Sequence, residues 1–166
     1  MTKKYLSMLL VIIVFISAIF FTFKFLSPPK AVHLHAGFQI YMDEKLLDFS
    51  DYKYMSLIPC TDNGKQDVHG KVHLHDGVGN IVHVHATHVT WGNLFTYLKF
   101  SIPPSKEVIS YVNGKKVETI QNIDIKAYDS LVIIIGTHQN IADYLKKSLT
   151  KQDIKIAETK NGICKG

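Results

Sequence analysis

Three closely spaced histidine pairs are the feature of this sequence most able to do chemistry, because they hold six of its nine histidines. The pairs are His33 with His35, His73 with His75, and His83 with His85. Alternate residues of a β-strand point to the same face, so the two rings of a pair can approach one cation. Imidazole nitrogen suits zinc, copper, nickel or iron. Because no cluster of thioethers favours copper(I), the pattern predicts a zinc or copper(II) cofactor.

The second and third pairs flank one turn-forming segment, DGVGN at residues 76–80. With a loop of five residues, position 75 pairs with 81 and position 73 with 83, so all four histidines share one face of a hairpin. The intervening apolar residues support this register, since they must all face the core: Val72, Leu74, Val82 and Val84. The periodicity therefore predicts one sheet face that is rich in imidazole.

Asp76 directly follows His75 and is a further candidate, either as a carboxylate ligand or as a partner that orients a ligating imidazole. Protonated imidazoles repel one another, so the cluster carries an electrostatic cost below about pH 6 without a counter-charge. A divalent cation removes that cost because it binds neutral rings. Two alternatives remain open, a pH-responsive cluster and a purely structural one. His69 and His88 rank below the three pairs, and His138 is expected in a loop.

A metal-dependent hydrolase is the catalytic alternative, because zinc held by three histidines with an open fourth position activates water. The sequence contains no HExxH helix, no GxSxG segment and no nucleotide-binding glycine loop. Asp76 or Asp67 could act as a base, but nothing in the sequence singles out either one. We therefore favour metal binding, for sequestration or delivery, over enzymatic activity.

The N-terminus has the composition of a membrane anchor. Residues 5–23 contain no charged side chain, and 19 residues at about 1.5 Å rise each span a bilayer core. Lys3 and Lys4 precede this stretch, which places the N-terminus in the cytoplasm. A cleaved signal peptide is the alternative, but no Ala-x-Ala site follows the apolar run. We predict a single-pass protein of the cell membrane with a cytoplasmic stub at 1–4, a transmembrane signal anchor at 5–26, a linker at 27–31 and an extracytoplasmic domain at 32–166.

The chain has two cysteines, Cys60 and Cys164. An even pair in an extracytoplasmic domain predicts a structural disulfide, and closing so long a loop stabilises by about 4 kcal/mol on the chain-entropy model. Metal ligation by Cys60 is the alternative. The spacing is not C-x-x-C, so a thioredoxin-like redox site has no support.

The charge of the chain argues against a nucleic-acid partner. The formal net charge is +5, but three of the 19 basic residues precede residue 28, which leaves 16 lysines against 14 acidic residues. The chain has no arginine, the usual bidentate reader of phosphate and guanine. The predicted partners are the membrane, through the N-terminal helix, and a metal ion.

Alternating and continuous apolar runs predict the elements that position the histidines. We expect strands at 31–42, 46–49, 71–75, 81–85, 108–112, 115–120 and 131–135, and helices at 91–100 and 143–149. Thr90 is the expected N-cap of the first helix, and the strand at 131–135 should be buried on both faces. The order predicts an α+β fold, a mostly antiparallel or mixed sheet with one packed helix; a β-grasp-like arrangement is one solution.

Four segments carry a resemblance to a known family: HLHAGFQIYMDEKLLDFS, VHLHDGVGNIVHVH, VTWGNLFTYL and YVNGKKV. They resemble small membrane-anchored or secreted proteins with an HxH…HxHD…GxxH pattern, found in candidate-phyla bacteria and ammonia-oxidising archaea. The resemblance covers nearly all of residues 30–166 and implies an extracytoplasmic anchored domain without deciding its chemistry. The residues that match its motif are His33, His35, His73, His75, Asp76 and His83. His85 carries over less directly than these six, since an acidic residue can stand at its position in similar archaeal sequences.

Overall fold

The computed structural model describes residues 5, 8, 12–17, 19, 32–56 and 68–160. The chain divides into two compact units, Met1–Lys30 and Ala31–Gly166. In the first unit, all the described residues are helical. Within the described part of the chain, no helix is long and apolar enough to cross a membrane. The anchor at 5–26 therefore stays a prediction.

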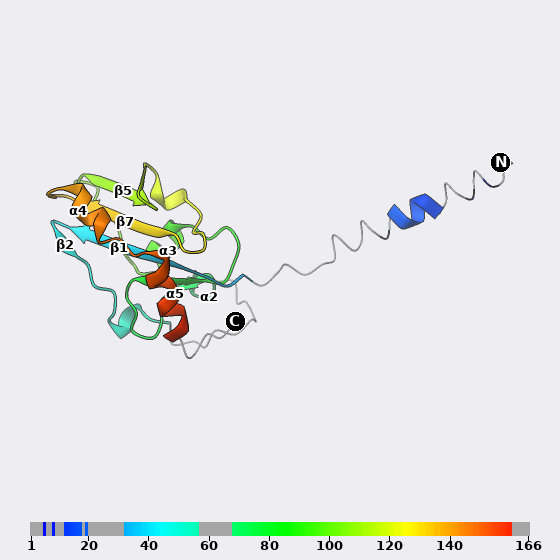
Figure 1. Cartoon of the computed structure of the whole chain (residues 1–166), viewed down its shortest axis with the longest axis horizontal. Coiled ribbons are helices and arrows are strands. Elements are labelled where there is room, and N and C mark those ends of the chain that lie inside the picture. The colour runs from blue at the N-terminus through cyan, green and yellow to red at the C-terminus, as the bar shows by residue number, and fades with distance from the viewer. Residues whose placement is uncertain are drawn as a thin grey trace. The chain divides into compact units, whose positions relative to one another are not determined.

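The second unit contains a sheet and short helices (Figure 1). Its elements are β1 (Leu34–Met42), β2 (Lys45–Leu46), the 3-10 helix η1 (Tyr52–Tyr54), α2 (Val68–Lys71), β3 (Val72–His73), β4 (Ile81–Val84), α3 (Trp91–Tyr97), β5 (Val108–Val112), β6 (Lys115–Val117), the 3-10 helix η2 (Ile120–Asn122), β7 (Ser130–Ile135), α4 (Ile141–Lys146) and α5 (Lys151–Lys160). Two hairpins, β3–β4 and β5–β6, lie where alternation and the Asn113-Gly114 turn predict them.

The strands form one mixed sheet in the order β3-β4-β1-β7-β5-β6, with β2 paired to β1. The first and last long strands, β1 and β7, lie side by side and parallel at its centre. All the other pairings are antiparallel. The sheet confirms the α+β class and places β4, the second strand of the histidine hairpin, directly against β1, which carries the first histidine pair.

One face of the sheet carries the main core. Alternate residues of β1, β4 and β7 point into it, and α3 covers them with Trp91 and Leu94, both fully buried. Thr90 caps α3 by accepting a hydrogen bond from the backbone N–H of Asn93, as predicted, and the Asn93 side chain accepts one in return. This packing orients the strands and so decides which residues face the other way.

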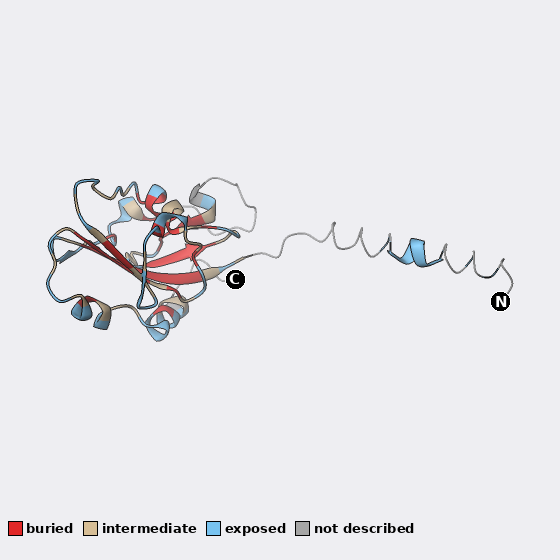
Figure 2. Ribbon diagram, turned by 90° about the horizontal axis from the view of Figure 1, so that it is seen from above, coloured by how far each residue is buried: buried red, intermediate tan, exposed pale blue. Residues whose placement is uncertain are grey.

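The opposite face carries α4, α5 and the histidines. A smaller apolar cluster of Tyr41, Val132, Ile134 and Tyr144 packs under α4. At Gly37 of β1, an added Cβ would lie 2.8 Å from a Leu149 methyl, so glycine allows the α4–α5 segment to approach the strand. Figure 2 shows helices on both sides of the buried strands. The sheet thus has helices on both faces, rather than the one packed helix that the sequence predicts.

The C-terminal segment departs most from the sequence prediction. The expected helix at 143–149 is α4, which begins at Ile141 and ends at Lys146. The following residues, expected as a polar tail, form α5. Thr150 begins this helix: its hydroxyl accepts from the Asp153 backbone N–H, and the Asp153 carboxylate accepts from the Thr150 N–H. Near the start of the unit, the strand expected at 46–49 is the two-residue β2.

Candidate metal centre

The three histidine pairs lie on three adjacent strands of the sheet, with β4 in the middle. His83 of β4 is directly opposite His73 of β3 on one side and His35 of β1 on the other. The 73-to-83 pairing confirms the register predicted from the five-residue turn. The pairing of β1 with β4 adds the first pair to the same face, so all six rings form one group, which we call the histidine face: His33, His35, His73, His75, His83 and His85.

Three rings of the histidine face meet at a single nitrogen. His35 Nε2 lies 2.7 Å from His83 Nδ1, and His75 Nε2 lies 2.9 Å from the same atom. All three side chains are buried, with exposed fractions of 8% for His35, 4% for His75 and 2% for His83. We call these three residues the inner trio. His35 lies on β1 and His83 on β4, whereas His75 lies two residues beyond the end of β3, at the start of the turn that leads to β4.

The outer nitrogen of each flanking ring faces a carboxylate. His35 Nδ1 lies 2.9 Å from Glu158 Oε1, and His75 Nδ1 lies 2.6 Å from Asp76 Oδ2. A carboxylate only accepts hydrogen bonds, so each Nδ1 donates and carries the ring proton. In a neutral ring the Nε2 of His35 and of His75 is then a lone pair, and both lone pairs point at His83 Nδ1.

With the flanking rings in this tautomer, only His83 can supply a proton at the centre. His83 Nδ1 can carry one hydrogen at most, and that hydrogen would face two acceptors at once. If the His83 proton lies on Nε2 instead, three lone pairs converge. Buried acceptors without donors are costly, and a cation bound by neutral nitrogens removes the conflict. The arrangement of these nitrogens is therefore compatible with a bound metal ion, and His33, His35 and His83 form a group that could hold one.

His33 lies beside the inner trio on the more exposed side. Nitrogen atoms of His33, His35 and His83 all lie within 4.8 Å of one another, close enough to share one ion. The ring of His33 lies 4.7 Å from that of His35, centroid to centroid. His33 is exposed, whereas His35 and His83 are buried, so His33 can complete the coordination from the solvent side.

His73 and His85 form the remainder of the histidine face. The ring of His85 lies between two others, 4.8 Å from His33 and 5.0 Å from His73, with nearly parallel planes. His85 Nε2 is buried and has no hydrogen-bond partner among the described residues. The structure thus brings all six predicted histidines together and puts His35 and His75 within hydrogen-bond distance of His83 Nδ1.

Burial and neighbouring imidazoles favour the neutral form of His83, His35 and His85, which is the form that binds metals. Burial is the main cause that lowers the pKa of His83, and the neighbouring imidazoles lower it further. Burial likewise lowers the pKa of His35, against an opposing effect of the hydrogen bond to Glu158. The pKa of His85 is lowered to about 4, again mainly by burial and then by His73 and His33. Protonation of these buried rings is therefore unfavourable in free energy.

No protein-family model matches the chain, and no curated protein or solved structure does either. The geometry of the histidine face therefore carries the functional argument.

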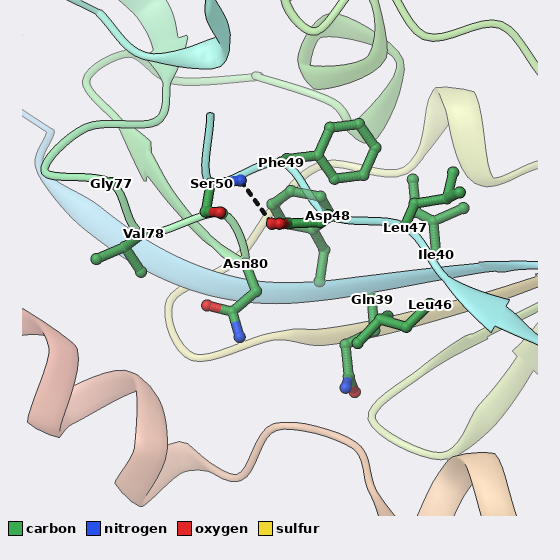
Figure 3. A pocket seen from close by; sticks show the side chains of 12 residues that line it. Gln39, Ile40, Leu46, Leu47, Asp48, Phe49, Ser50, Gly77, Val78 and Asn80 are labelled. Atoms are coloured by element: carbon green, nitrogen blue, oxygen red, sulfur yellow. Dashed lines mark hydrogen bonds between the residues drawn. The ribbon is translucent and has the colours of Figure 1, made fainter. Parts of the chain in front are cut away.

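A pocket of about 410 Å³ lies at the edge of β1, between β2 and the 76–80 turn. Figure 3 shows Val78 and Asn80 on one side of it and Leu46 and Gln39 on the other, with the Ser50 N–H donating to Asp48. None of its lining residues is a histidine. The pocket is thus separate from the inner trio.

Two of the lower-ranked candidates, His88 and His138, fall outside the histidine face. His88 is exposed and contacts Asp124, and the ring of His138 contacts the Gly136 carbonyl in a loop. His69 belongs to α2. Cys60, Cys164 and Asp67 lie outside the described residues, so the disulfide and the alternative roles of Cys60 and Asp67 stay predictions.

Glu158 is the site residue that sequence reasoning missed. It lies 123 positions from His35 along the chain, in a segment expected to be a polar tail. One local signal was available. Thr150 and Asp153 have the spacing of a helix N-terminus, and recognising it would have placed a carboxylate on a helix two turns later.

Proposed function

We propose that the protein binds one zinc or copper(II) ion on the histidine face, through His35 Nε2, His75 Nε2 and His83 Nδ1, with His33 as the fourth ligand. One observation carries this proposal. Two buried imidazole nitrogens, His35 Nε2 and His75 Nε2, both lie within 2.9 Å of a third, His83 Nδ1. Four neutral imidazoles satisfy the tetrahedral preference of zinc and also suit copper(II).

The role that this site supports best is sequestration or delivery of the metal. A catalytic zinc ion needs an open position next to a substrate cleft and a base. Four rings leave no such position, and the pocket of Figure 3 contains no histidine. The exposed ring of His33, beside three buried ones, suits instead a site that exchanges its ion with solvent or with a partner.

The setting of the site is also part of the proposal. We infer that residues 5–26 anchor the chain in the cell membrane and that residues 32–166 are extracytoplasmic. The uncharged stretch after Lys3 and Lys4 supports this, as does the resemblance to anchored and secreted proteins.

We further infer a β-grasp-like fold, which is supported by the central parallel pair of β1 and β7 and by α3 on one face of the sheet.

Metal stoichiometry of matched variants tests the binding proposal. The full-length chain, purified in mild detergent without a histidine tag, is loaded with zinc or copper(II), dialysed and subjected to elemental analysis. We expect about one equivalent in the wild type and in His88→Ala, and almost none in the His35→Ala/His83→Ala double variant. His88→Ala is the matched control because its ring is exposed and outside the histidine face. Equal metal content in all three proteins would refute the proposal.

A further inference from the structure

Two carboxylates reach the inner trio from different parts of the chain. Glu158 comes from α5 at the C-terminus, and Asp76 comes from the turn between β3 and β4. Each contacts the Nδ1 of one flanking imidazole, His35 or His75, and leaves the Nε2 of that ring directed at His83. The two contacts are equivalent in chemistry although the two segments are unrelated in sequence.

Resting on the metal-binding function proposed above, we infer that Glu158 and Asp76 are the positioning residues of the centre. Each holds its histidine in the Nδ1–H tautomer, so that Nε2 is a lone pair directed at the ion. A carboxylate on the far nitrogen also makes the ligating nitrogen more basic. Together the two carboxylates supply two negative charges, which neutralise a divalent ion bound by neutral rings. The substrate class is therefore a divalent transition-metal cation.

The packing of α5 on β1 places Glu158 beside His35. Ile154 of α5 is fully buried, and α5 approaches β1 at Gly37, where a larger residue would collide with Leu149. The hydroxyl of Tyr128 donates to Glu158 Oε2 at 3.4 Å, which leaves Oε1 for His35. The carboxylate is thus held at both oxygens, and its side chain is 26% exposed.

The turn places Asp76 by its backbone conformation. Asp76 and Gly77 both have positive φ, 60° and 70°, and the Val78 N–H donates to the His75 carbonyl at 3.1 Å. Aspartate is among the few residues with a side chain that tolerate this left-handed region. The conformation turns the chain just after β3 and brings the carboxylate back onto the ring of the preceding residue.

The chain offers a control pair. His88 and Asp124 also form a histidine–carboxylate contact, at 3.2 Å, but on the surface and away from the inner trio. Asp124→Asn therefore changes the same chemistry without touching the centre. Glu158→Gln and Asp76→Asn keep a hydrogen-bond acceptor and remove one charge each, whereas Glu158→Ala removes both charge and acceptor.

The test combines zinc affinity with imidazole tautomers. Zinc affinity of the full-length protein is measured by competition with a chelator, and ring 15N chemical shifts of the metal-free protein report the tautomers. We expect affinity to fall about 10- to 100-fold in Glu158→Ala, less in Glu158→Gln and Asp76→Asn, and not at all in Asp124→Asn. In the metal-free wild type, His35 and His75 should carry the proton on Nδ1, and His35 should lose that preference in Glu158→Ala.

The outcomes separate this inference from the function on which it rests. Wild-type protein that takes up no zinc would overturn both. Normal uptake by the wild type, together with unchanged affinity in Glu158→Ala and Asp76→Asn, would overturn the positioning role alone. So would a proton found on Nε2 of His35 and His75 in metal-free wild type, a measurement that needs no variant to fold.

Discussion

The strands β3, β4 and β1 share one alternating pattern, but their two faces have different roles, one in core packing and one in presenting imidazoles. On one face the residues are apolar and fully buried, as Leu74 and Val82 are, and they pack against the core under α3. The other face carries the imidazoles, and nitrogen atoms of His35 and His75 lie within 2.9 Å of a third nitrogen, His83 Nδ1. Each strand therefore serves packing and chemistry through alternate residues.

The difference shows where the precision of the centre comes from. The apolar face is satisfied by contacts within the domain, because burial of apolar surface is favourable without further partners. In the inner trio, by contrast, ring nitrogens contact one another, and a buried lone pair needs a donor or a cation. Core packing on one side thus holds the imidazoles of the other side in register. This division predicts that stability and metal affinity respond to different substitutions.

The largest effect on stability should come from the apolar face. Leu74 lies between His73 and His75 in sequence but points to the core and is 0% exposed. Leu74→Ala should lower the free energy of unfolding of the metal-free protein by about 2–5 kcal/mol, because it leaves a cavity. Urea titration measures this loss. Leu46→Ala, at a position 52% exposed, is the control and should change stability by less than about 0.5 kcal/mol.

The corresponding change on the histidine face should act on affinity. His83→Ala removes the nitrogen on which the other two members of the inner trio converge. A structural zinc site contributes about 10–16 kcal/mol, so one ligand of four is worth about 3 kcal/mol, or roughly 100-fold in zinc affinity. Chelator competition under conditions where both proteins are folded measures it. If Leu74→Ala weakened zinc binding as much as His83→Ala, the proposed division between the faces would be wrong.

The two faces should also differ in their response to pH. The folded-state pKa values of His83, His35 and His85 lie below the ordinary value of about 6.5, mainly through burial. Below about pH 6.5 the unfolded chain therefore binds protons that the folded chain does not. The free energy of unfolding should decrease as the pH is lowered from about 6.5 toward 4. Urea midpoints of the metal-free protein between pH 7.5 and 4.5 should show this decline. A midpoint independent of pH over that range would contradict it, and His88→Gln should leave the decline unchanged.

The smallest expected effect concerns α5, which carries Glu158 to the histidine face. Thr150→Ala removes the side-chain cap at the start of this helix and should cost about 1 kcal/mol of stability. Thr150→Ser retains the hydroxyl and is the matched control. Hydrogen exchange of the α5 amides should be faster in Thr150→Ala and unchanged in Thr150→Ser. Equal protection in both variants would show that α5 is held by packing alone.

Local pattern was sufficient to predict much of this structure. Alternation, together with the five-residue turn at 76–80, predicted the register of His73 with His83 and the shared face of the hairpin. The Thr90 cap and the buried strand at 131–135 follow from equally local signals. In each case the residues that determine the local structure lie within a few positions of one another, so these features can be predicted from a short stretch of sequence.

Long-range placement could not be predicted in the same way. Nothing near His33 and His35 indicates that β1 pairs with β4, because that choice depends on how the complete sheet fits together. The approach of Glu158 depends on Gly37, which reads in the sequence as an ordinary strand glycine. The six histidines were therefore predictable as candidates, whereas the inner trio and its carboxylates required the fold.

X-ray absorption spectroscopy of the zinc-loaded, full-length protein tests the central claim most directly, because it reports the atoms bound to the ion. The account predicts a first coordination sphere of nitrogen at about 2.0 Å with the multiple-scattering pattern of at least three imidazoles, and its collapse in the His35→Ala/His83→Ala variant. A sphere dominated by oxygen, or one unchanged by that double substitution, would contradict metal binding by the inner trio.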